Sequence, residues 1–279
     1  MSITLYNSTS YKISRLITKR YSTSFSLGIR MLHKKYHNPI YAIYGFVRCA
    51  DEIVDSFPDS IQEDLLMKFI DDTHQAIQKK VSAHPVLHAF QEVVHQYSIE
   101  QDLIKAFFHS MQMDLIEKKH AEQSYSEYIY GSAEVVGLMC LNVFCENNRE
   151  LYNQLLAPAR SLGSAFQKIN FLRDMKSDFQ ERGRTYFPGV EFENFSQTSK
   201  QQIEADIQKD LDDSLQGIRS LPSGSRLGVS VAYVYYCSLF RKIKSTSPAV
   251  ILEERIRVPD SEKLFLLIKT WFRFQLNLI

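Results

Sequence analysis

The chain has 279 residues, and its 33 Lys and Arg balance 32 Asp and Glu to a formal net charge of +1. This balance argues against a strongly electrostatic nucleic-acid binder, and 44% hydrophobic with 23% charged residues excludes a disordered or low-complexity chain. Its 10 Gly and 8 Pro are fewer than a β-sandwich or a phosphate-binding α/β fold normally needs for its turns. The composition therefore favours long helices.

No segment has the pattern of an export signal or of a membrane span. The four cysteines form no C-x-x-C pair and are expected to be reduced, small core residues. Residues 1–9 are polar, and the longest nearly apolar run, Leu227 to Phe240, is shorter than the roughly 17–25 residues that cross a bilayer. We therefore expect a cytoplasmic protein with one domain over residues 1–279, of which residues 1–20 are an N-terminal segment that can move.

Apolar residues recur with helical spacing along most of the chain. They predict helices over residues 40–55, 60–81, 85–97, 100–119, 124–147, 149–180, 200–220 and 225–245, and from residue 261 onward. Asp59 or Ser60 suits the N-cap of the second helix, and Pro158 is expected to kink or interrupt the sixth. Residues 182–198 hold two glycines and a proline and are predicted as an extended loop. Strand-like alternation is scarce, so the predicted fold class is all-α.

The helix predicted at residues 40–55 carries a polar stripe on an otherwise apolar surface. Its stripe residues are spaced by three or four and therefore share one face: Tyr41, Tyr44, Arg48, Asp51 and Asp55. Two carboxylates at i and i+4 repel each other, and a cation between them removes that penalty. Mg²⁺ prefers oxygen ligands, typically one or two carboxylates with substrate phosphates. A solvated acidic face, or pairing with Arg48, is the alternative explanation for one such pair.

A second acidic face lies on the helix predicted at residues 149–180. Gln167, Asn170, Asp174 and Asp178 share this face, and small residues precede it by one or two turns. Two such helices facing each other across a cavity would hold several Mg²⁺ ions and, through them, diphosphates. Nearby arginines can hold phosphate oxygens by bidentate hydrogen bonds: Arg48, Arg173, Arg182 and Arg184.

Five segments, in this order, resemble motifs of the squalene/phytoene synthase family, the head-to-head prenyl transferases. They are the serine-rich Ser22-Thr-Ser-Phe-Ser26, Asp51-Glu-Ile-Val-Asp55 with Arg48 before it, Tyr128-x-Tyr-Gly-Ser-Ala-Glu-Val-Val-Gly-Leu-Met139, Gln167-x-x-Asn-x-x-Arg-Asp-x-x-x-Asp178, and Arg182-Gly-Arg-x-Tyr-Phe-Pro188. The resemblance extends from about residue 14 to about residue 268. Five motifs in the family's order are far more specific than any one of them.

The resemblance implies a fold and a reaction. The fold is the all-α isoprenoid-synthase fold, a single helical bundle around a central cavity. The substrates are two prenyl diphosphates, with two or three Mg²⁺ ions in the active site. One diphosphate ionises to an allylic cation, and the second chain attacks it to give a cyclopropylcarbinyl diphosphate. That intermediate ionises, rearranges, and either loses a proton or is reduced.

The resemblance also implies roles for individual residues. The Mg²⁺ ligands would be Asp51, Asp55, Asn170, Asp174 and Asp178. Gln167 would lie near the reacting carbons, while Tyr44 and Tyr236 could present aromatic faces to the cation. The other substrate contacts would be Tyr41, Arg48, Arg173, Arg184 and Tyr186 at the diphosphates, Ser22, Ser24 and Phe25 over them at the cavity mouth, and Val136 and Gly137 along the tunnel for the prenyl tails. Tyr236 is also explained as a core residue, and Gly137 as a helix-packing glycine.

The substrate is predicted from the segments that look most like bacterial phytoene synthases, the central helix and the R-G-R segment. They favour condensation of two geranylgeranyl diphosphates to phytoene, with release of diphosphate, in carotenoid biosynthesis and without NADPH. One alternative is dehydrosqualene or squalene from two farnesyl diphosphates, of which squalene would need NADPH. The other is a non-catalytic scaffold, against which the four motif aspartates argue.

The expected partners follow from this chemistry. Phytoene has no polar group, so its release into water is unfavourable, and we expect peripheral contact with the inner face of the cell membrane. No strongly basic amphipathic helix stands out as the anchor, no nucleic-acid partner is expected, and the oligomeric state is not readable.

Several other charged groups are predicted to be structural. The acidic pairs at residues 71–72 and 212–213 lack an aromatic or arginine stripe, so solvated faces are expected there. His84 and His88 are expected on the surface. The segment Arg255 to Lys263 also resembles a family segment, and a structural role is favoured for it. The role of Glu134 is left open.

Overall fold

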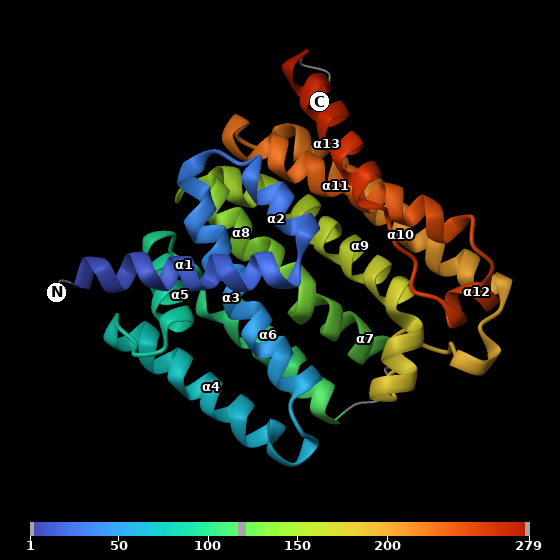
Figure 1. Ribbon diagram of the computed structural model, residues 1–279, viewed down its shortest axis with the longest axis horizontal. Helices are drawn as coiled ribbons and strands as arrows, with labels where there is room; N and C mark the ends of the chain where they lie inside the picture. Colours follow the sequence, from blue (N-terminus) through green and yellow to red (C-terminus); the bar gives the residue numbers. More distant parts are fainter. Residues whose placement is uncertain (1–2, 117–120, 277–279) are drawn as a thin grey trace.

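The computed structural model describes residues 3–116 and 121–276, and within these ranges the fold is built from helices (Figure 1). The α-helices are α1 (Ile3–Tyr21), α2 (Thr23–Arg30), α3 (Lys34–Ser56), α4 (Asp59–Lys79), α5 (Pro85–Gln96), α6 (Gln101–Ile116), α7 (Glu122–Ile129), α8 (Val135–Cys145), α9 (Arg149–Arg182), α10 (Gln197–Ser220), α11 (Ser223–Lys244), α12 (Pro248–Glu253) and α13 (Asp260–Gln275). A π-helical turn, η1 (Tyr130–Glu134), joins α7 to α8, and a short 3₁₀ turn, η2 (Phe192–Asn194), lies before α10. The all-α prediction is confirmed.

The apolar side chains form two core clusters that meet along α8 and α9. One cluster fills the space between α3, α5, α6 and α8, where the Phe46 and Phe90 rings stack with centroids 3.8 Å apart. The other lies between α9, α10 and α11 around Ile169 and Leu239, both fully buried. α8 is apolar all round, as expected of a helix with neighbours on every side. The stretch Glu122–Cys145 is long and apolar enough to cross a membrane, but most of it is buried in the core.

Several helix boundaries differ from the sequence-based expectation. α9 runs through Pro158 without interruption, and the proline ring packs on Gly217 of α10, where any Cβ would overlap it. The helix predicted at residues 124–147 is divided by η1. The N-cap of α4 is Pro58, with no side-chain hydrogen bond, so the prediction of Asp59 or Ser60 was wrong.

The N-terminal residues form α1, which packs across α3 and α5 (Figure 1). Its inner face buries Ser10, Ser14 and Thr18, and the hydroxyls of Ser14 and Thr18 donate to carbonyls one turn earlier in the same helix. A segment expected to move is thus a helix with a packed face. The single-domain organisation stays a prediction.

Candidate active site

A cavity of about 1340 Å³ lies inside the bundle, between α2, α3, α8, α9, α11 and the segment before α13. It exceeds the roughly 300–1,000 Å³ typical of small-molecule sites. Both predicted acidic faces line it: Asp51 and Asp55 from α3, and Asp174 and Asp178 from α9. The structure therefore brings together four carboxylates from two helices that are far apart in the sequence.

Most of the other predicted site residues also line this cavity: Ser22, Ser24, Phe25, Tyr44, Arg48, Val136, Gly137, Gln167, Asn170, Arg173 and Tyr236. Tyr41, Arg184 and Tyr186 are not part of the lining. Tyr41 shares its helix face with lining residues, and Arg184 and Tyr186 belong to the same motif as the lining residue Arg182. Packing against neighbouring elements therefore determines which residues of a face or motif reach the cavity.

Tyr41 is placed in the core. Its side chain is 1% exposed, and Arg15 of α1 lies over its ring, with 5.7 Å between the guanidinium carbon and the ring centroid. Helix α1, which the sequence analysis did not predict, covers this turn of α3. The structure therefore does not support the expected contact between Tyr41 and diphosphate.

Arg184 lies behind the acidic end of the cavity. Gly183 ends α9 in the left-handed conformation with φ +67°, and this turn lets the Arg184 amide donate to the Asp178 carbonyl at 2.9 Å. The Arg184 guanidinium then reaches Asp55 with 2.8 Å between Nη1 and Oδ1, and donates to the Val54 carbonyl at 2.9 Å. Arg184 therefore holds Asp55 in place, and its expected contact with diphosphate stays a prediction.

Asp114 of α6 is a buried member of the same network that the sequence analysis missed. Its carboxylate lies 3.5 Å from Arg184 Nη1 and accepts hydrogen bonds from the Tyr128 hydroxyl at 2.8 Å and the Tyr186 hydroxyl at 3.3 Å. Burial raises the pKa of Asp114 to about 6, although Arg184 opposes the rise. The signal in the sequence is an acidic residue among apolar ones near the end of this helix.

Each of the four cavity aspartates has a guanidinium partner. Arg182 is 3.4 Å from Asp55 and 3.0 Å from Asp178. Arg48 is 3.9 Å from Asp51, but its closer partner is Glu52, one helical turn away. Two further ion pairs are Arg173 with Asp174 and, at 2.7 Å, Arg255 with Asp174. Arg255 comes from the segment favoured as structural, and both it and Lys263 line the cavity. The segment thus forms one wall of the acidic end, and the structural role favoured for it stays a prediction.

The crowding of carboxylates changes their acidity. Burial raises the pKa of Asp51 to about 7; the neighbouring Asp55 adds to the rise and Arg48 opposes it. Burial likewise raises the pKa of Asp178 to about 7, with a further contribution from Asp174. Without a cation these two groups are partly protonated near neutral pH, so a bound divalent cation would displace protons.

Aromatic rings line the same end of the cavity. The Phe25 and Tyr44 ring centroids are 5.6 Å apart, and the Phe166 and Tyr236 rings stack at 3.8 Å. The Tyr236 hydroxyl donates to Asn170 Oδ1 at 3.2 Å, which ties this ring to the second acidic face. Tyr236 is therefore both a buried residue of the second core cluster and part of the cavity wall.

An apolar arm extends the cavity away from the carboxylates. Its lining includes Ile40, Phe144, Leu155 and Leu221. At 1.5 Å of rise per residue, Leu155 lies about 28 Å from Asp174 along α9. Glu134, whose role was open, does not line the arm: its carboxylate pairs with Arg160 at 2.5 Å. The cavity thus has one charged end and one long apolar end.

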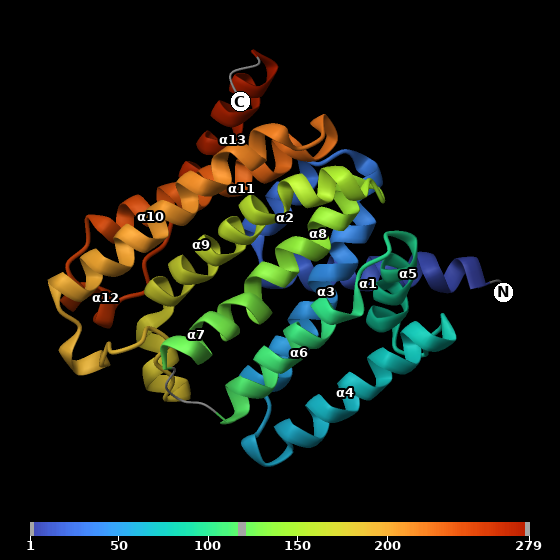
Figure 2. The same cartoon turned by 180° about the vertical axis from the view of Figure 1, so that it is seen from behind.

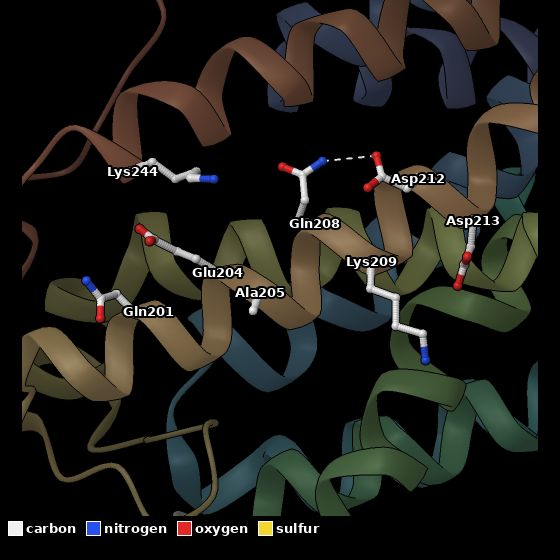
Figure 3. Close-up of a pocket in the computed structure, with 8 residues that line it drawn as sticks. All are labelled: Gln201, Glu204, Ala205, Gln208, Lys209, Asp212, Asp213 and Lys244. Carbon is white, nitrogen blue, oxygen red and sulfur yellow. Dashed lines mark hydrogen bonds between the residues drawn. The ribbon is translucent and has the colours of Figure 1, made fainter.

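Other predicted charged groups lie outside this cavity. A second hollow, of about 620 Å³, is lined by a row of residues from α10 and by Lys244 of α11, which Figure 3 shows. Asp212 and Asp213 line it and are exposed, as predicted, and Gln208 Nε2 donates to Asp212 at 3.0 Å. The prediction for His88 was wrong, because this side chain is 2% exposed and bonds to Asn7 of α1 at 2.9 Å.

The donor set of the main cavity fits Mg²⁺. Four carboxylates and the Asn170 amide supply oxygen donors, which Mg²⁺ prefers over nitrogen and sulfur. Within residues 3–116 and 121–276, no three His, Cys, Asp or Glu side chains are close enough to hold one ion by themselves. A site that takes part of its coordination from water and phosphate oxygens matches this arrangement.

The fold matches that of known proteins. A crystal structure of a dehydrosqualene synthase superposes with a TM-score of 0.82 at 22% identity, covering 96% of this chain and 98% of that one. The squalene synthase HpnC from Alicyclobacillus acidocaldarius gives a TM-score of 0.75 at 15% identity, over 86% and 95% of the two chains. These likenesses define the class: a helical bundle with the fold of the squalene and dehydrosqualene synthases.

The sequence comparison then gives the family. The squalene/phytoene synthase model matches residues 18–262, so the chain belongs to that family. The 15-cis-phytoene synthase of Synechococcus elongatus is 26% identical over 285 residues, covering 92% of this chain and 91% of the relative. The 4,4'-diapophytoene synthase of Staphylococcus haemolyticus is 27% identical over 203 residues, 70% and 68% of the two chains. The resemblance seen in the motifs is confirmed.

Proposed function

We propose that this protein joins two geranylgeranyl diphosphates head to head, through a cyclopropylcarbinyl diphosphate, and forms phytoene with release of diphosphate. The coarser statement, a prenyl transferase of the head-to-head class, follows from membership of the family. The observation that carries the proposal is the cavity itself, where two opposed pairs of carboxylates meet one long apolar arm. Such a cavity suits substrates that have a diphosphate at one end and a hydrocarbon tail at the other.

The choice of the longer substrate rests on the relatives. The Synechococcus protein, matched over 92% of this chain, is a 15-cis-phytoene synthase. Condensation of two farnesyl diphosphates is the second candidate, favoured by the diapophytoene synthase relative and by the dehydrosqualene synthase structure with its TM-score of 0.82. Phytoene formation consumes no reductant, so the proposal includes no NADPH.

The carboxylates have a direct role in this reaction. Asp51, Asp55, Asp174 and Asp178, with Asn170, would hold two or three Mg²⁺ ions together with the phosphate oxygens. When bound, these ions neutralise the charge that develops on the leaving diphosphate.

The arginines and aromatic rings complete the chemistry. Arg48, Arg173, Arg182 and Arg255 now pair with the carboxylates, and can turn to phosphate oxygens when a metal takes their partners. The rings of Tyr44 and Tyr236 face the same space and can stabilise a developing carbocation. The apolar arm keeps water away from that cation, which would otherwise be trapped as an alcohol.

The test is incubation of pure protein with Mg²⁺ and labelled geranylgeranyl or farnesyl diphosphate in separate tubes, without NADPH, followed by hydrocarbon extraction. A C40 product from the longer substrate alone supports the proposal. Asp178→Asn should lower the rate at least about 100-fold, whereas Asp213→Asn on the exposed face of α10 should not change it. A C30 product from the shorter substrate alone would refute geranylgeranyl diphosphate as the substrate. Folded protein with no turnover in either tube would favour a scaffold.

A further inference from the structure

The C-terminal helix α13 presents an apolar face to solvent. Six large side chains on and just after it are 41–67% exposed: Leu264, Phe265, Ile268, Trp271, Phe272 and Leu276. The opposite side of the helix packs on α11 through the buried Thr270. Figure 1 shows α13 projecting at one end of the molecule. Single exposed apolar residues are ordinary, but six on one helical face form a contiguous patch of the kind that marks an interaction surface.

This apolar face begins at the mouth of the cavity. Asp260 and Lys263, in the first turn of α13, line the cavity beside Tyr21 and Phe25, which are themselves partly exposed. The Lys263 ammonium donates to the Thr23 hydroxyl at the start of α2, at 3.3 Å. A ligand leaving the cavity here would meet the apolar side of α13.

Basic side chains lie along the helix that ends at this mouth and on α13 itself. Helix α1 ends there, contains no acidic residue, and exposes four basic ones: Lys12, Arg15, Lys19 and Arg20. On α13, Lys269 and Arg273 are exposed beside the apolar face. Figures 1 and 2 show α1 and α13 on the same side of the molecule. The basic helix that the sequence analysis did not find is thus α1.

This combination selects one kind of partner. An apolar helix face flanked by basic residues matches a bilayer with anionic headgroups, where acyl chains accept the apolar side chains. A symmetric contact with a second copy would bring basic helices of like sign together. We infer that α13 docks on an anionic bilayer with α1 at the headgroups; the biological role of this docking rests on the proposed function. The cavity then opens to the lipid, so prenyl tails enter and the hydrocarbon leaves without crossing water.

The chain contains a built-in probe of this contact, because Trp271 is its one tryptophan and lies on the apolar face. Vesicles of phosphatidylcholine with phosphatidylglycerol should shift its emission to shorter wavelength, brominated lipid should quench it, and the protein should sediment with the vesicles. The double variant Phe265→Glu/Phe272→Glu should bind at least about tenfold more weakly. The matched control, Ile61→Glu/Met67→Glu on the exposed side of α4, should bind as wild type.

The electrostatic part is tested separately. Each basic residue near an anionic surface contributes about 1 kcal/mol, so Lys12→Gln/Lys19→Gln should weaken binding roughly tenfold or more, and only for anionic vesicles. Circular dichroism checks that each variant is folded, which is expected because all replaced side chains are exposed.

Three results would overturn the inference. They are no binding to anionic vesicles, unchanged binding of the α13 variant, and lipid-free self-association that the same variant abolishes. Product formation in detergent is measured in parallel. Product formation without vesicle binding would support the proposed function and refute the membrane-docking inference. Vesicle binding without product formation would support membrane docking and refute the proposed function.

Discussion

Replacing Arg184 by glutamine tests how the acidic end of the cavity is held together. The wild-type guanidinium is 8% exposed, lies 2.8 Å from Asp55 and 3.5 Å from Asp114, and donates to the Val54 carbonyl. Arg184→Gln leaves two nearby carboxylates without their shared counter-ion. Removing one partner of a buried ion pair costs about 3–5 kcal/mol.

The expected loss lies at the lower end of that range. Asp55 retains Arg182 at 3.4 Å, and Asp114, whose pKa is about 6, can take up a proton. A loss of about 3 kcal/mol corresponds to a fall in Tm of roughly 6–12 °C for a chain of this size. Because Asp55 is also less firmly held, the Mg²⁺ concentration for half-maximal activity should rise about 10–100-fold.

The assay is thermal unfolding at pH 5.5 and pH 7.5, together with a Mg²⁺ titration of activity. The loss of stability should be smaller at pH 5.5, where the protonated Asp114 no longer needs a cation. Arg149→Gln is the control, since its ion pair with Glu100 is also short, at 2.5 Å, but more than 45% exposed on both sides. Exposed pairs contribute about 0–1 kcal/mol. A deficit no larger than that of the control, or one independent of pH, would refute the reasoning.

Three further predictions concern other parts of the cavity and the core. The folded-state pKa values of Asp51 and Asp178 are raised to about 7, so ionisation of these groups destabilises the fold progressively as pH rises from about 4 to 7. Metal-free protein should therefore melt at a higher temperature at pH 6 than at pH 8. Mg²⁺ with inorganic diphosphate should reduce that difference. Phe144→Ala lengthens the apolar arm, and competition assays should show the preference shifting toward the longer diphosphate by about tenfold. Gly217→Ala forces a Cβ against Pro158 and should lower the free energy of unfolding by about 1–3 kcal/mol, as urea titration can measure.

The sequence predicted the four cavity aspartates because helical spacing alone decides which residues share a face. It could not predict which part of that face is covered. Tyr41 lies one turn from Tyr44 on the same stripe, yet α1 buries it. Helix α1 was itself missed because the fully buried residues of its inner face are Ser10, Ser14 and Thr18, which interrupt the apolar pattern. The hydroxyls of Ser14 and Thr18 donate to carbonyls of the same helix.

The support behind the carboxylates was harder still to predict. The R-G-R segment identified Arg184 as functional, but only the turn at Gly183 directs it behind Asp55 and away from the lining. Asp114 has no motif, and its partners come from α7 and from the loop after α9. Such contacts depend on tertiary packing, which the periodicity along one helix does not predict.

The bond between Arg184 and Asp55 also bears on how the molecule folds and unfolds. It joins residues 129 positions apart, so it can form only after the loop between them has closed. Contacts of this kind are expected to be absent from the folding transition state, and strengthening them slows unfolding more than it speeds folding. Substrate bound to both α3 and α9 would stabilise the folded state reversibly. The protein should therefore resist proteolysis better with substrate bound than without it. The gain in the free energy of unfolding depends on the ratio of ligand concentration to Kd.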